Sequence, residues 1–421
     1  MRLTTLLKKV QSSRDEIVEL CSDLVKIPTP NPPGDTDKCA RFIEAYFNRH
    51  GIPAKIHSRH PGKANVVAKV EGTGSGKLLW LGHIDVVPEG DSASWRHEPY
   101  GGKVEGDLVY GRGSSDMKGS CAAAMVAARI LHETGRSPAT VEFWFTCDEE
   151  TQGVDGARWL TEEGLIKGDC CIIGDSSGST PFRPYIDIGC KGLLWTTLKA
   201  RGKTAHGSTP YLGDNAIEKL LHVISHVQKI GSLRLKIPDE LRPAVRSSIN
   251  FLLSTEKLTI KQQRAVKRIY DYPTVSINLL TGGVKVNVVP DTAEVSIDIR
   301  FTPGVDFNKL REQVQSLIQE AAVEGVSAEY RIGSGYYESS SSPFATQLSK
   351  AVHKATGHIP RFKILTGGTD AIILKNLLDI PCLGFGAGVE GMAHAPNEYV
   401  PVEQLLMAAK VYAAFPFVYY Q

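Results

Sequence analysis

The chain has 421 residues, of which 42% are hydrophobic and 22% are charged, as in ordinary folded proteins. This length exceeds what one compact core usually serves, so we expect two domains, or one domain interrupted by another. Lys and Arg total 48 against 46 Asp and Glu, a balance that argues against a nucleic-acid-binding protein. No run approaches the roughly 18 apolar residues of a transmembrane helix, so we expect no membrane partner.

The N-terminal segment and the cysteines favour a cytoplasmic protein. Residues 1–16 contain no sustained apolar core and do not look like a signal peptide. The eight cysteines form no C-x-x-C pair and are too sparse for a disulfide scaffold. We therefore expect reduced, mostly buried thiols and a cytoplasmic location.

Helices and strands alternate over the first part of the chain. The spacing of apolar residues predicts helices at 15–25, 38–50, within 115–133 and at 156–163. Apolar runs predict strands at 64–70, 77–87, 140–146 and 170–173. Prolines force a loop at 28–34, and glycines at 71–76 predict a hairpin turn. This alternation predicts an α/β fold with a mixed, largely parallel sheet covered by helices.

A different order of elements begins near residue 191. Strands are expected at 193–200, 275–280, 293–301 and 327–332, and helices at 215–228 and 307–324. Their order, β-α-β-β-α-β, is that of a ferredoxin-like module, here with a charged helical insertion at 240–270. The α/β pattern resumes after the serines at 339–342. We therefore predict a catalytic domain from residues 1–190 and 336–421, and an inserted α+β lid or dimerisation domain at 191–335.

Acidic and histidine side chains follow five apolar, strand-like segments of the predicted catalytic domain. In chain order they are His83 with Asp85, Asp116, Glu149 with Glu150, Asp175, and His394. Ligands of open α/β sheets lie outside the carboxyl ends of strands, so these side chains are expected to converge. So many carboxylates together are unfavourable unless cations neutralise them, and imidazole with carboxylate suits zinc. Each residue alone is unremarkable, but the joint pattern predicts a metal centre.

With these motifs in this order, the chain resembles the dinuclear zinc hydrolases that include acetylornithine deacetylase, succinyl-diaminopimelate desuccinylase, aminoacylase and carboxypeptidase G. The resemblance covers nearly the whole chain and implies a zinc-exopeptidase-like catalytic domain. It implies two Zn²⁺ ions per subunit, which Co²⁺ or Mn²⁺ can replace. By the resemblance, Asp116 bridges both ions, His83 and Asp175 complete one site, and Glu150 and His394 complete the other.

The resemblance also implies a role for each of the remaining carboxylates. Asp85 would form a hydrogen bond with His83, and Glu149 would be the general base, although the sequence alone leaves Glu149 and Glu150 interchangeable. Elementary chemistry is compatible with these roles. A carboxylate can bridge cations about 3.5–4 Å apart. A free carboxylate can take a proton from water whose pKa a zinc ion has lowered.

Substrate contacts are implied for the inserted domain and for one glycine-rich loop. In the resembling family, residues like His206, Asn287 and Arg300 meet the substrate carboxylate or the developing oxyanion, sometimes across a dimer interface. Gly367, Gly368 and Thr369 match a loop that shapes the substrate pocket. The lid often pairs edge to edge in that family, so a homodimer is expected.

The substrate class stays open between two members of one reaction class. At the position of Asp175, deacylases and carboxypeptidases usually carry Glu, whereas dipeptidases and aminopeptidases carry Asp. The chain length and the loop at 366–370 favour the deacylases instead. We therefore expect metal-dependent hydrolysis of an amide bond in a small N-acyl amino acid or a short peptide.

Two alternative functions compete with this interpretation. Gly174-Asp-Ser176-Ser-Gly178 fits the nucleophile motif of serine hydrolases, with Asp370 and His394 later in the chain. That motif must run directly into a helix, which the prolines at 181 and 184 forbid. The other alternative is a non-enzymatic binding protein on the same fold. All expected ligands and the base are present, which argues against it.

Overall fold

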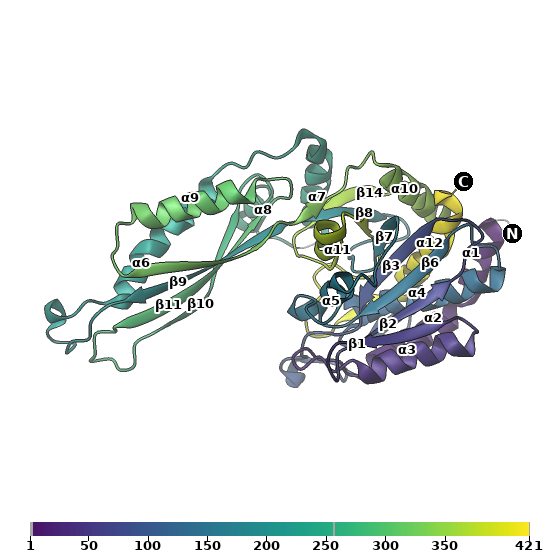
Figure 1. Cartoon of the computed structure of the whole chain (residues 1–421), viewed down its shortest axis with the longest axis horizontal. Coiled ribbons are helices and arrows are strands. Elements are labelled where there is room, and N and C mark those ends of the chain that lie inside the picture. The colour runs from purple at the N-terminus through teal and green to yellow at the C-terminus, as the bar shows by residue number, and fades with distance from the viewer. Residues whose placement is uncertain (1–2, 256, 421) are drawn as a thin grey trace. The chain divides into compact units, whose positions relative to one another are not determined.

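The computed structural model describes residues 3–255 and 257–420, and these form two compact units (Figure 1). Unit 1 comprises Met1–Gly189, Glu338–Ile364 and Thr369–Gln421. Unit 2 comprises Cys190–Tyr337 and Leu365–Gly368. The chain therefore leaves the first unit to form the second and returns just before the serine run at 339–342. It passes into the second unit once more, for the four residues Leu365–Gly368.

The large sheet of the described residues is mixed. Its strands are β1 (Ala54–Ser58), β2 (Ala64–Val70), β3 (Lys77–His83), β6 (Thr140–Thr146), β7 (Cys170–Ile173), β8 (Tyr185–Cys190), β13 (Tyr336–Tyr337), β14 (Arg361–Leu365) and β15 (Cys382–Gly384). The strand order is β1-β2-β6-β3-β7-β15-β8-β13, with β14 paired to β8. The central pairs β6–β3, β3–β7 and β7–β15 are parallel, while β1–β2, β2–β6 and β15–β8 are antiparallel. The predicted α/β class is confirmed.

Helices pack around this sheet, and all those predicted for the first part of the chain are confirmed within a few residues. The predicted helices are α2 (Arg14–Val25), α3 (Asp37–Arg49), α4 (Gly119–Thr134) and α5 (Ala157–Glu162). The other helices of unit 1 are α1 (Leu3–Ser12), α10 (Pro343–Thr356), α11 (Ala371–Leu378) and α12 (Val402–Tyr419). α4 is rich in fully buried alanines and packs against α2 and α12. Small side chains let these helices approach closely.

The predicted hairpin at 71–76 is wrong. β2 and β3 do not pair with each other, because β6 lies between them, antiparallel to β2 and parallel to β3. A glycine-rich segment signals a change of direction but not which strands become neighbours. Strand β3 is also shorter than expected, since it ends at His83.

Three short strands form a separate small sheet in unit 1. They are β4 (Lys103–Glu105), β5 (Leu108–Tyr110) and β16 (Tyr399–Pro401), with β5 in the middle. Strand β16 pairs antiparallel with β5, so the chain just after His394 lies against the chain just before Asp116. This pairing brings two distant segments to the same place.

Unit 2 has the predicted ferredoxin-like order. Its strands are β9 (Gly192–Arg201), β10 (Thr274–Gly282), β11 (Thr292–Phe301) and β12 (Val326–Gly333), and its longer helices are α6 (Ala216–Val227), α7 (Arg242–Thr255), α8 (Ile260–Val266) and α9 (Phe307–Glu320). The sheet order is β10-β11-β9-β12, with antiparallel neighbours. Helices α6 and α9 lie along the sheet (Figure 1), and α7 and α8 occupy the charged insertion.

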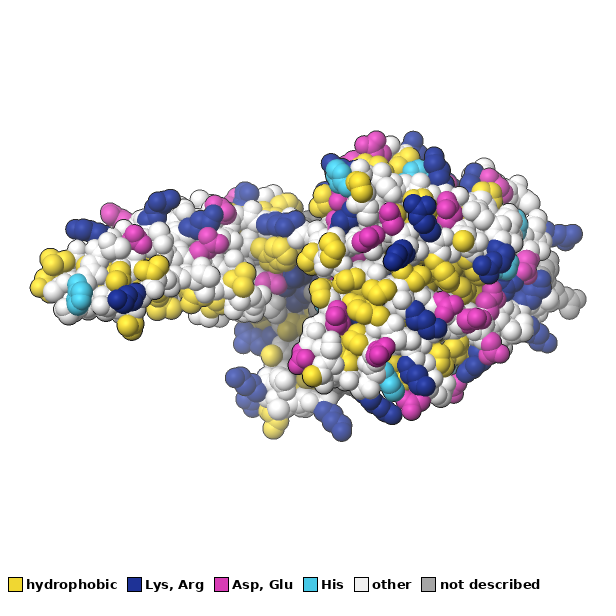
Figure 2. Space-filling view, turned by 90° about the horizontal axis from the view of Figure 1, so that it is seen from below, with side chains coloured by type: hydrophobic (Ala, Val, Ile, Leu, Met, Phe, Trp, Pro, Cys, Tyr) yellow, Lys and Arg dark blue, Asp and Glu magenta, His cyan; other side chains and the backbone are white. Residues whose placement is uncertain are grey.

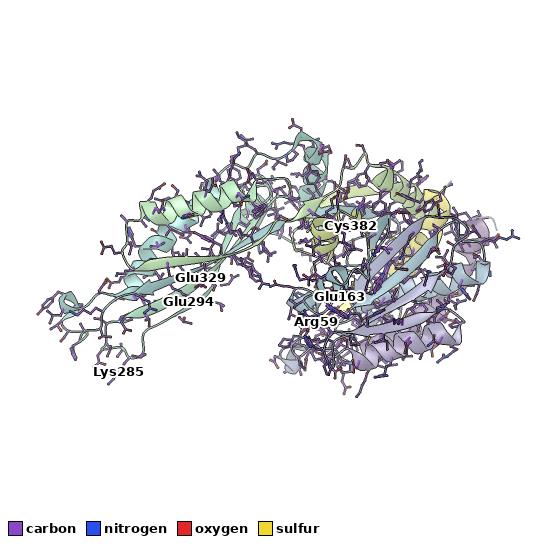
Figure 3. The ribbon with its side chains drawn as sticks, viewed as in Figure 1. Arg59, Glu163, Lys285, Glu294, Glu329 and Cys382 are labelled. Carbon is purple, nitrogen blue, oxygen red and sulfur yellow. The ribbon has the colours of Figure 1, made fainter. Side chains whose placement is uncertain are left out.

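Side chains alternate between the two faces of the unit 2 sheet. Leu194 and Leu198 are buried on the helix-covered face, whereas Lys199 lies on the other face and pairs with Glu329 at 2.7 Å. Glu294 on β11 is exposed on that polar face, and both glutamates are labelled in Figure 3. Cations and anions are interspersed on the face seen in Figure 2, as the balanced composition leads one to expect.

All eight cysteines are buried and none is in a disulfide. Burial raises the pKa of Cys21 to about 12, so its thiol stays protonated at neutral pH. Among the described residues, no helix has both the length and the apolar character needed to cross a bilayer.

Candidate dinuclear metal centre

Parallel strands deliver the predicted residues to one edge of the large sheet. His83 is the last residue of β3, and Asp175 lies two residues beyond β7. Glu149 and Glu150 lie in a short helical turn, Glu149–Thr151, that follows β6. Strands β6, β3 and β7 are adjacent and parallel, so their carboxyl ends meet.

The side chains form two clusters that share one carboxylate. His83, Asp116 and Asp175 offer ligand atoms that all lie within 4.8 Å of one another, and so do Asp116, Glu150 and His394. His83 Nε2 lies 3.1 Å from Asp116 Oδ1, and His394 Nε2 lies 3.4 Å from Asp116 Oδ2. His394 Nε2 is also 3.2 Å from Glu150 Oε2. Asp116 therefore points one oxygen at each histidine, as a bridging ligand would.

A non-helical turn aims Asp116 at the clusters. It lies in the segment Ser114–Lys118, which leads into α4, with φ −130° and ψ 91°. The peptide bond between Asp116 and Met117 is cis. Met117 is buried, and its sulfur accepts the backbone N–H of His83 at 3.3 Å.

Asp85 is fully buried and organises the turn that carries the two glutamates. Its carboxylate accepts the backbone N–H groups of Glu149 and Glu150, each at 3.2 Å. His83 Nδ1 lies 2.9 Å from the backbone carbonyl of Asp85 and 3.7 Å from its Oδ1. A carbonyl accepts only from an N–H, so Nδ1 carries a hydrogen and Nε2 is left as the ligand atom.

The site carries more negative charge than its histidines offset. Burial, with the neighbouring Asp116 carboxylate, raises the pKa of Asp175 to about 8. Hydrogen bonds to Asp116 and Glu150 raise the pKa of His394 to about 10. Burial opposes protonation of His83, but its hydrogen bond to Asp116 still raises its pKa well above the usual value. In the absence of metal, the raised pKa values keep protons on these side chains, and these protons offset the negative charge that divalent cations would otherwise neutralise.

The donor set fits metal ions. Imidazole nitrogen and carboxylate oxygen are ordinary zinc ligands, and each cluster supplies three residues. Glu150 Oε1 is buried without a hydrogen-bond partner among the described residues, which is costly unless something else binds there. A cation in the second cluster would satisfy this oxygen.

Comparison with known proteins agrees with this site. The model for peptidase family M20/M25/M40 matches residues 79–416, which include all members of both clusters. The chain belongs to this family. It is therefore a metal-dependent hydrolase of amide bonds.

Two similar sequences carry the same description. Succinyl-diaminopimelate desuccinylase of Methylocella silvestris is 30% identical, over 94% of this chain and 96% of its own length. A probable succinyl-diaminopimelate desuccinylase of Staphylococcus aureus is 27% identical, over 94% and 95%. Both alignments span nearly the whole enzyme, so both units are shared with these relatives.

Solved structures share the fold at lower identity. The M20 family metallo-carboxypeptidase Sso-CP2 from Sulfolobus solfataricus has a TM-score of 0.81 at 22% identity, covering 96% of this chain and 99% of that one. The YXEP protein of Bacillus subtilis, described as a dinuclear metal binding peptidase from the M20 family, has a TM-score of 0.66 at 18% identity, covering 96% and 98%. The mixed fold of this enzyme is thus that of M20 peptidases.

Several residues that surround the clusters were not foreseen from the sequence. The Nδ2 group of Asn31, in the proline-rich loop, lies 2.8 Å from Asp85 Oδ2 and 3.2 Å from Asp148 Oδ1. Lys63 binds Asp148 Oδ1 at 2.7 Å. The loop at 28–34 offered a signal for Asn31, because prolines fix the backbone around a polar residue. Lys63 offered none.

Asp370 is a further buried carboxylate near the site. Its Oδ2 accepts the hydroxyl of Thr146, the last residue of β6, at 3.1 Å. Burial raises its pKa to about 7, and its charge contributes to the raised pKa of Glu149. It directly follows the predicted loop residue Thr369, which is also buried.

The predicted residues of unit 2 fall at two separate ends of its sheet. His206 and Asn287 are neighbours, since His206 bridges to Val288 and the N–H of Gly207 donates to the carbonyl of Asn287 at 2.8 Å. They lie beyond Arg201, which pairs with Thr292. Arg300 lies eight residues after Thr292 on β11, so it is about 27 Å from Thr292, at the opposite end of the strand. Within one chain, these residues do not form one group.

The remaining predictions concern the glycine-rich loop and the serine motif. Gly367 and Gly368 fall in the short piece of unit 2 after β14, and Gly367 has open space where a side chain would be. Ser176 donates to the buried carboxylate of Asp187 at 2.5 Å, and no helix follows it before β8. A nucleophile elbow requires that helix, so the motif lacks the geometry of a serine hydrolase.

Proposed function

We propose that this enzyme hydrolyses the amide bond of a small N-acyl amino acid or short peptide with two zinc ions and with Glu149 as general base. The observation that carries the proposal is the pair of clusters that share Asp116, next to a glutamate that belongs to neither. Glu149 is held beside them because its backbone N–H binds Asp85. Co²⁺ or Mn²⁺ would suit the same oxygen and nitrogen ligands.

Bound zinc ions would supply Lewis acidity to the scissile carbonyl and lower the pKa of water to near neutrality. The protein moves the proton. Burial raises the pKa of Glu149 well above its usual value, and the nearby charges of Asp370 and Asp175 add to this. Such a carboxylate can take a proton from the attacking water and return it to the leaving amine. Asp85 keeps both His83 and the Glu149–Glu150 turn in place.

The residues of unit 2 would bind the substrate. His206 Nδ1 accepts the N–H of Ser208 at 3.2 Å, so the neutral ring carries its hydrogen on Nε2, where it can donate to a developing oxyanion. Arg300 binds Asp298 through Nε, which orients its guanidinium group for a substrate carboxylate. Asn287, Gly367, Gly368 and Thr369 would complete the substrate contacts.

Of the two substrate classes, similarity favours the acylated amino acids. The relatives that match over nearly the whole length are described as desuccinylases. The neighbours by fold include a carboxypeptidase and a di-peptidase, Dug1p of Saccharomyces cerevisiae, at 22% and 17% identity. We therefore place N-succinyl and N-acetyl amino acids first and dipeptides second.

A panel of these compounds tests the proposal with metal-loaded protein. We expect turnover of at least one class, loss of turnover after chelation, and its return with Zn²⁺ or Co²⁺. Glu149→Ala should reduce turnover by at least about 100-fold while two metal equivalents remain bound. Glu163→Ala, at the exposed end of α5, is the matched control and should leave turnover unchanged.

Two results would reject this function. Activity that survives chelation but disappears with a serine-directed acylating reagent would favour Ser176. A metal-loaded protein that binds these compounds without cleaving any of them would indicate a binding protein.

We further propose a homodimer through unit 2. Strand β10 is an edge strand, and it exposes Ile277, Leu279 and Leu280. Val284 and Val286 in the next turn are almost fully exposed. A long apolar edge is a template for pairing with another strand. A second subunit could supply His206 and Asn287 to a site that uses Arg300 of the first, which would explain their separation within one chain.

We place the enzyme in the cytoplasm. Eight buried cysteines without a disulfide suit a reducing compartment.

A further inference from the structure

One buried ion pair touches both loops that carry the second metal cluster. Arg112 and Glu398 are 2% and 0% exposed, and Arg112 Nη1 lies 2.6 Å from Glu398 Oε2. Arg112 precedes the segment that contains Asp116, and Glu398 follows the loop that contains His394. The pair joins parts of unit 1 that are 286 positions apart in sequence.

Glu398 holds the backbone around Asp116. Its Oε1 accepts the N–H groups of Ser115 at 2.8 Å and Asp116 at 2.9 Å, and its Oε2 accepts that of Gly113 at 3.0 Å. Its backbone carbonyl accepts the N–H of Gly111 at 2.9 Å. A carboxylate that receives three amides and a guanidinium has little freedom, so it fixes the turn from which Asp116 projects.

Arg112 holds the backbone around His394. Its Nη2 donates to the carbonyl of His394 at 3.3 Å, and its Nη1 donates to that of Ala395 at 3.2 Å. His394 has φ 64°, in the left-handed region that is unfavourable for a residue with a Cβ. Charged donors on the two carbonyls stabilise this conformation, and only a planar fork can reach Glu398 and both carbonyls together.

We propose that Arg112 and Glu398 are positioning residues that set Asp116 and His394 in ligand geometry before metal binds. This inference rests on the proposed metal centre. Glu398 acts on Asp116, which both clusters share, whereas Arg112 acts on His394, which only the second cluster contains. The two residues therefore have different consequences: loss of the Arg112 contacts weakens one metal site, and loss of the Glu398 contacts weakens both.

Arg112→Lys separates these effects. The lysine keeps a positive charge beside Glu398 but cannot bind both carbonyls, so the loop of His394 is released. In titrations of metal-free protein with Co²⁺, followed by calorimetry and visible absorption, we expect one equivalent to bind as in the wild type. The other should bind about 10–100-fold more weakly, as for other residues that orient metal ligands. His394→Ala, which removes the ligand itself, should weaken the same equivalent.

Arg129→Lys is the matched control. Arg129 forms two hydrogen bonds with the carboxylate of Glu16, from Nη2 at 2.7 Å and from Nε at 3.0 Å. It lies on α4, about 15 Å along the helix axis from the start of the helix. This variant should lower thermal stability but leave both Co²⁺ affinities unchanged. Glu398→Gln, which keeps the shape but loses the charge, should weaken both equivalents.

The outcomes distinguish this inference from the proposed function. A wild-type protein that takes up no metal would reject the metal centre. A wild type with two Co²⁺ ions and an Arg112→Lys variant that binds both as tightly, or loses both equally, would reject the role of Arg112. Unchanged affinities in Glu398→Gln would reject that of Glu398.

A measurement on the wild type needs no variant to fold. If the pair positions Asp116 in advance, the amide hydrogens of Gly113, Ser115 and Asp116 should stay protected from exchange in the metal-free protein. Fast exchange of all three, with protection that appears only when Co²⁺ is added, would overturn the proposal.

Discussion

At the scale of single residues, Lys191 shows how burial changes a side chain away from the metal centre. It is 2% exposed, its ammonium group donates to the carbonyl of Ile269, and it lies 5.1 Å from the ring centre of Tyr270. Burial lowers its pKa to about 7, and the charge of Arg300 contributes. No carboxylate contributes to this shift, so the cationic form is poorly stabilised in the folded protein.

Lys191 should make stability rise with pH. Below pH 7 it is protonated in both states, and above about 10.5 it is neutral in both. Between these values the unfolded chain binds a proton that the folded one lacks. The free energy of unfolding therefore gains up to about 1.4 kcal/mol per pH unit from this group. Other groups also titrate in this range, but they are common to both proteins. Between pH 7 and 9.5, the slope of the free energy of unfolding in urea should therefore be more positive in the wild type than in Lys191→Met, by up to this amount.

The control for this prediction is Lys199→Met. Lys199 lies on β9 near Lys191 in sequence, but its side chain is exposed beside Glu329. It should keep the slope of the wild type. Equal slopes for the wild type and Lys191→Met would show that Lys191 does not titrate in this range.

Single residues were predictable from the sequence where chemistry and position coincide. Among His83, Asp116, Glu150, Asp175 and His394, the sequence signal is most direct for His83, which ends β3, and for Asp175, which lies two residues beyond β7. Asp116 and His394 lie further from the preceding strands β5 and β15, and they stood out only as part of the joint pattern. Arg112 and Glu398 could not be predicted, because an arginine and a glutamate far apart in sequence look like surface residues until the fold buries them together. The sequence also cannot show that His83 Nδ1 lies closer to the carbonyl of Asp85 than to its carboxylate.

At the scale of elements, the loops after the parallel strands pack backbone against backbone. Gly386 lies just beyond β15, and a Cβ there would come within 1.9 Å of the carbonyl oxygen of Gly174, just beyond β7. The same atom would come within 2.7 Å of the hydroxyl of Ser120 at the start of α4. The loop ahead of His394 therefore has no room for a side chain at this position.

Gly386→Ala should destabilise unit 1. The backbone must shift to admit the methyl group, which typically costs about 1–3 kcal/mol. We expect a thermal midpoint lower by several degrees, measured by calorimetry on metal-loaded protein. Gly367→Ala is the control, because no described atom lies within 4 Å of the place its methyl group would take and its φ is not positive. An unchanged midpoint for Gly386→Ala would mean that the two loops can separate freely.

Elements were predictable where their pattern was long and regular. Helices α2, α3 and α4 and strands β2, β6 and β7 lie close to the expected ranges. The hairpin at 71–76 was wrong, because the insertion of β6 between β2 and β3 is a long-range event without a local signal. Strands β4 and β5 have three residues each, which is too little pattern to be recognised. They form because β5 pairs with β4 on one side and with the distant β16 on the other.

At the scale of the whole molecule, the proposed dimer makes a distinct prediction about two inactive variants. Glu149→Ala and His206→Ala should each be nearly inactive as homodimers. If His206 serves the site of its partner subunit, a mixed dimer contains one complete site. Co-expression of the two variants should then restore about one quarter of the wild-type turnover, since half of the dimers are mixed and each has one working site.

The edge of β10 supplies the control for this experiment. Leu279→Lys, introduced into both variants, places a charge on the exposed apolar edge and should prevent pairing. Sedimentation should then show monomers, and co-expression should restore nothing. If both variants are inactive and their mixed dimers show no recovery, His206 acts within its own chain. An active His206→Ala homodimer would show that His206 is not needed for turnover.

The two-unit organisation was predictable from the change of element order near residue 191, while the return of four residues after β14 to unit 2 was not. A short loop carries no pattern that reveals which unit it joins.

The cysteines are distributed unequally between the two units, so the units differ in the number of thiols that can be alkylated when they open. Cys190 is the first residue of unit 2, and the other seven cysteines lie in unit 1. Shielded thiols do not react with alkylating reagents until the surrounding structure opens. Cys190 is also the last residue of β8 in the large sheet, so it lies at the junction of the two units. The mass that a pulse of iodoacetamide adds during heating therefore follows the opening of unit 1, whereas unit 2 can open beyond this junction without gaining a carbamidomethyl group.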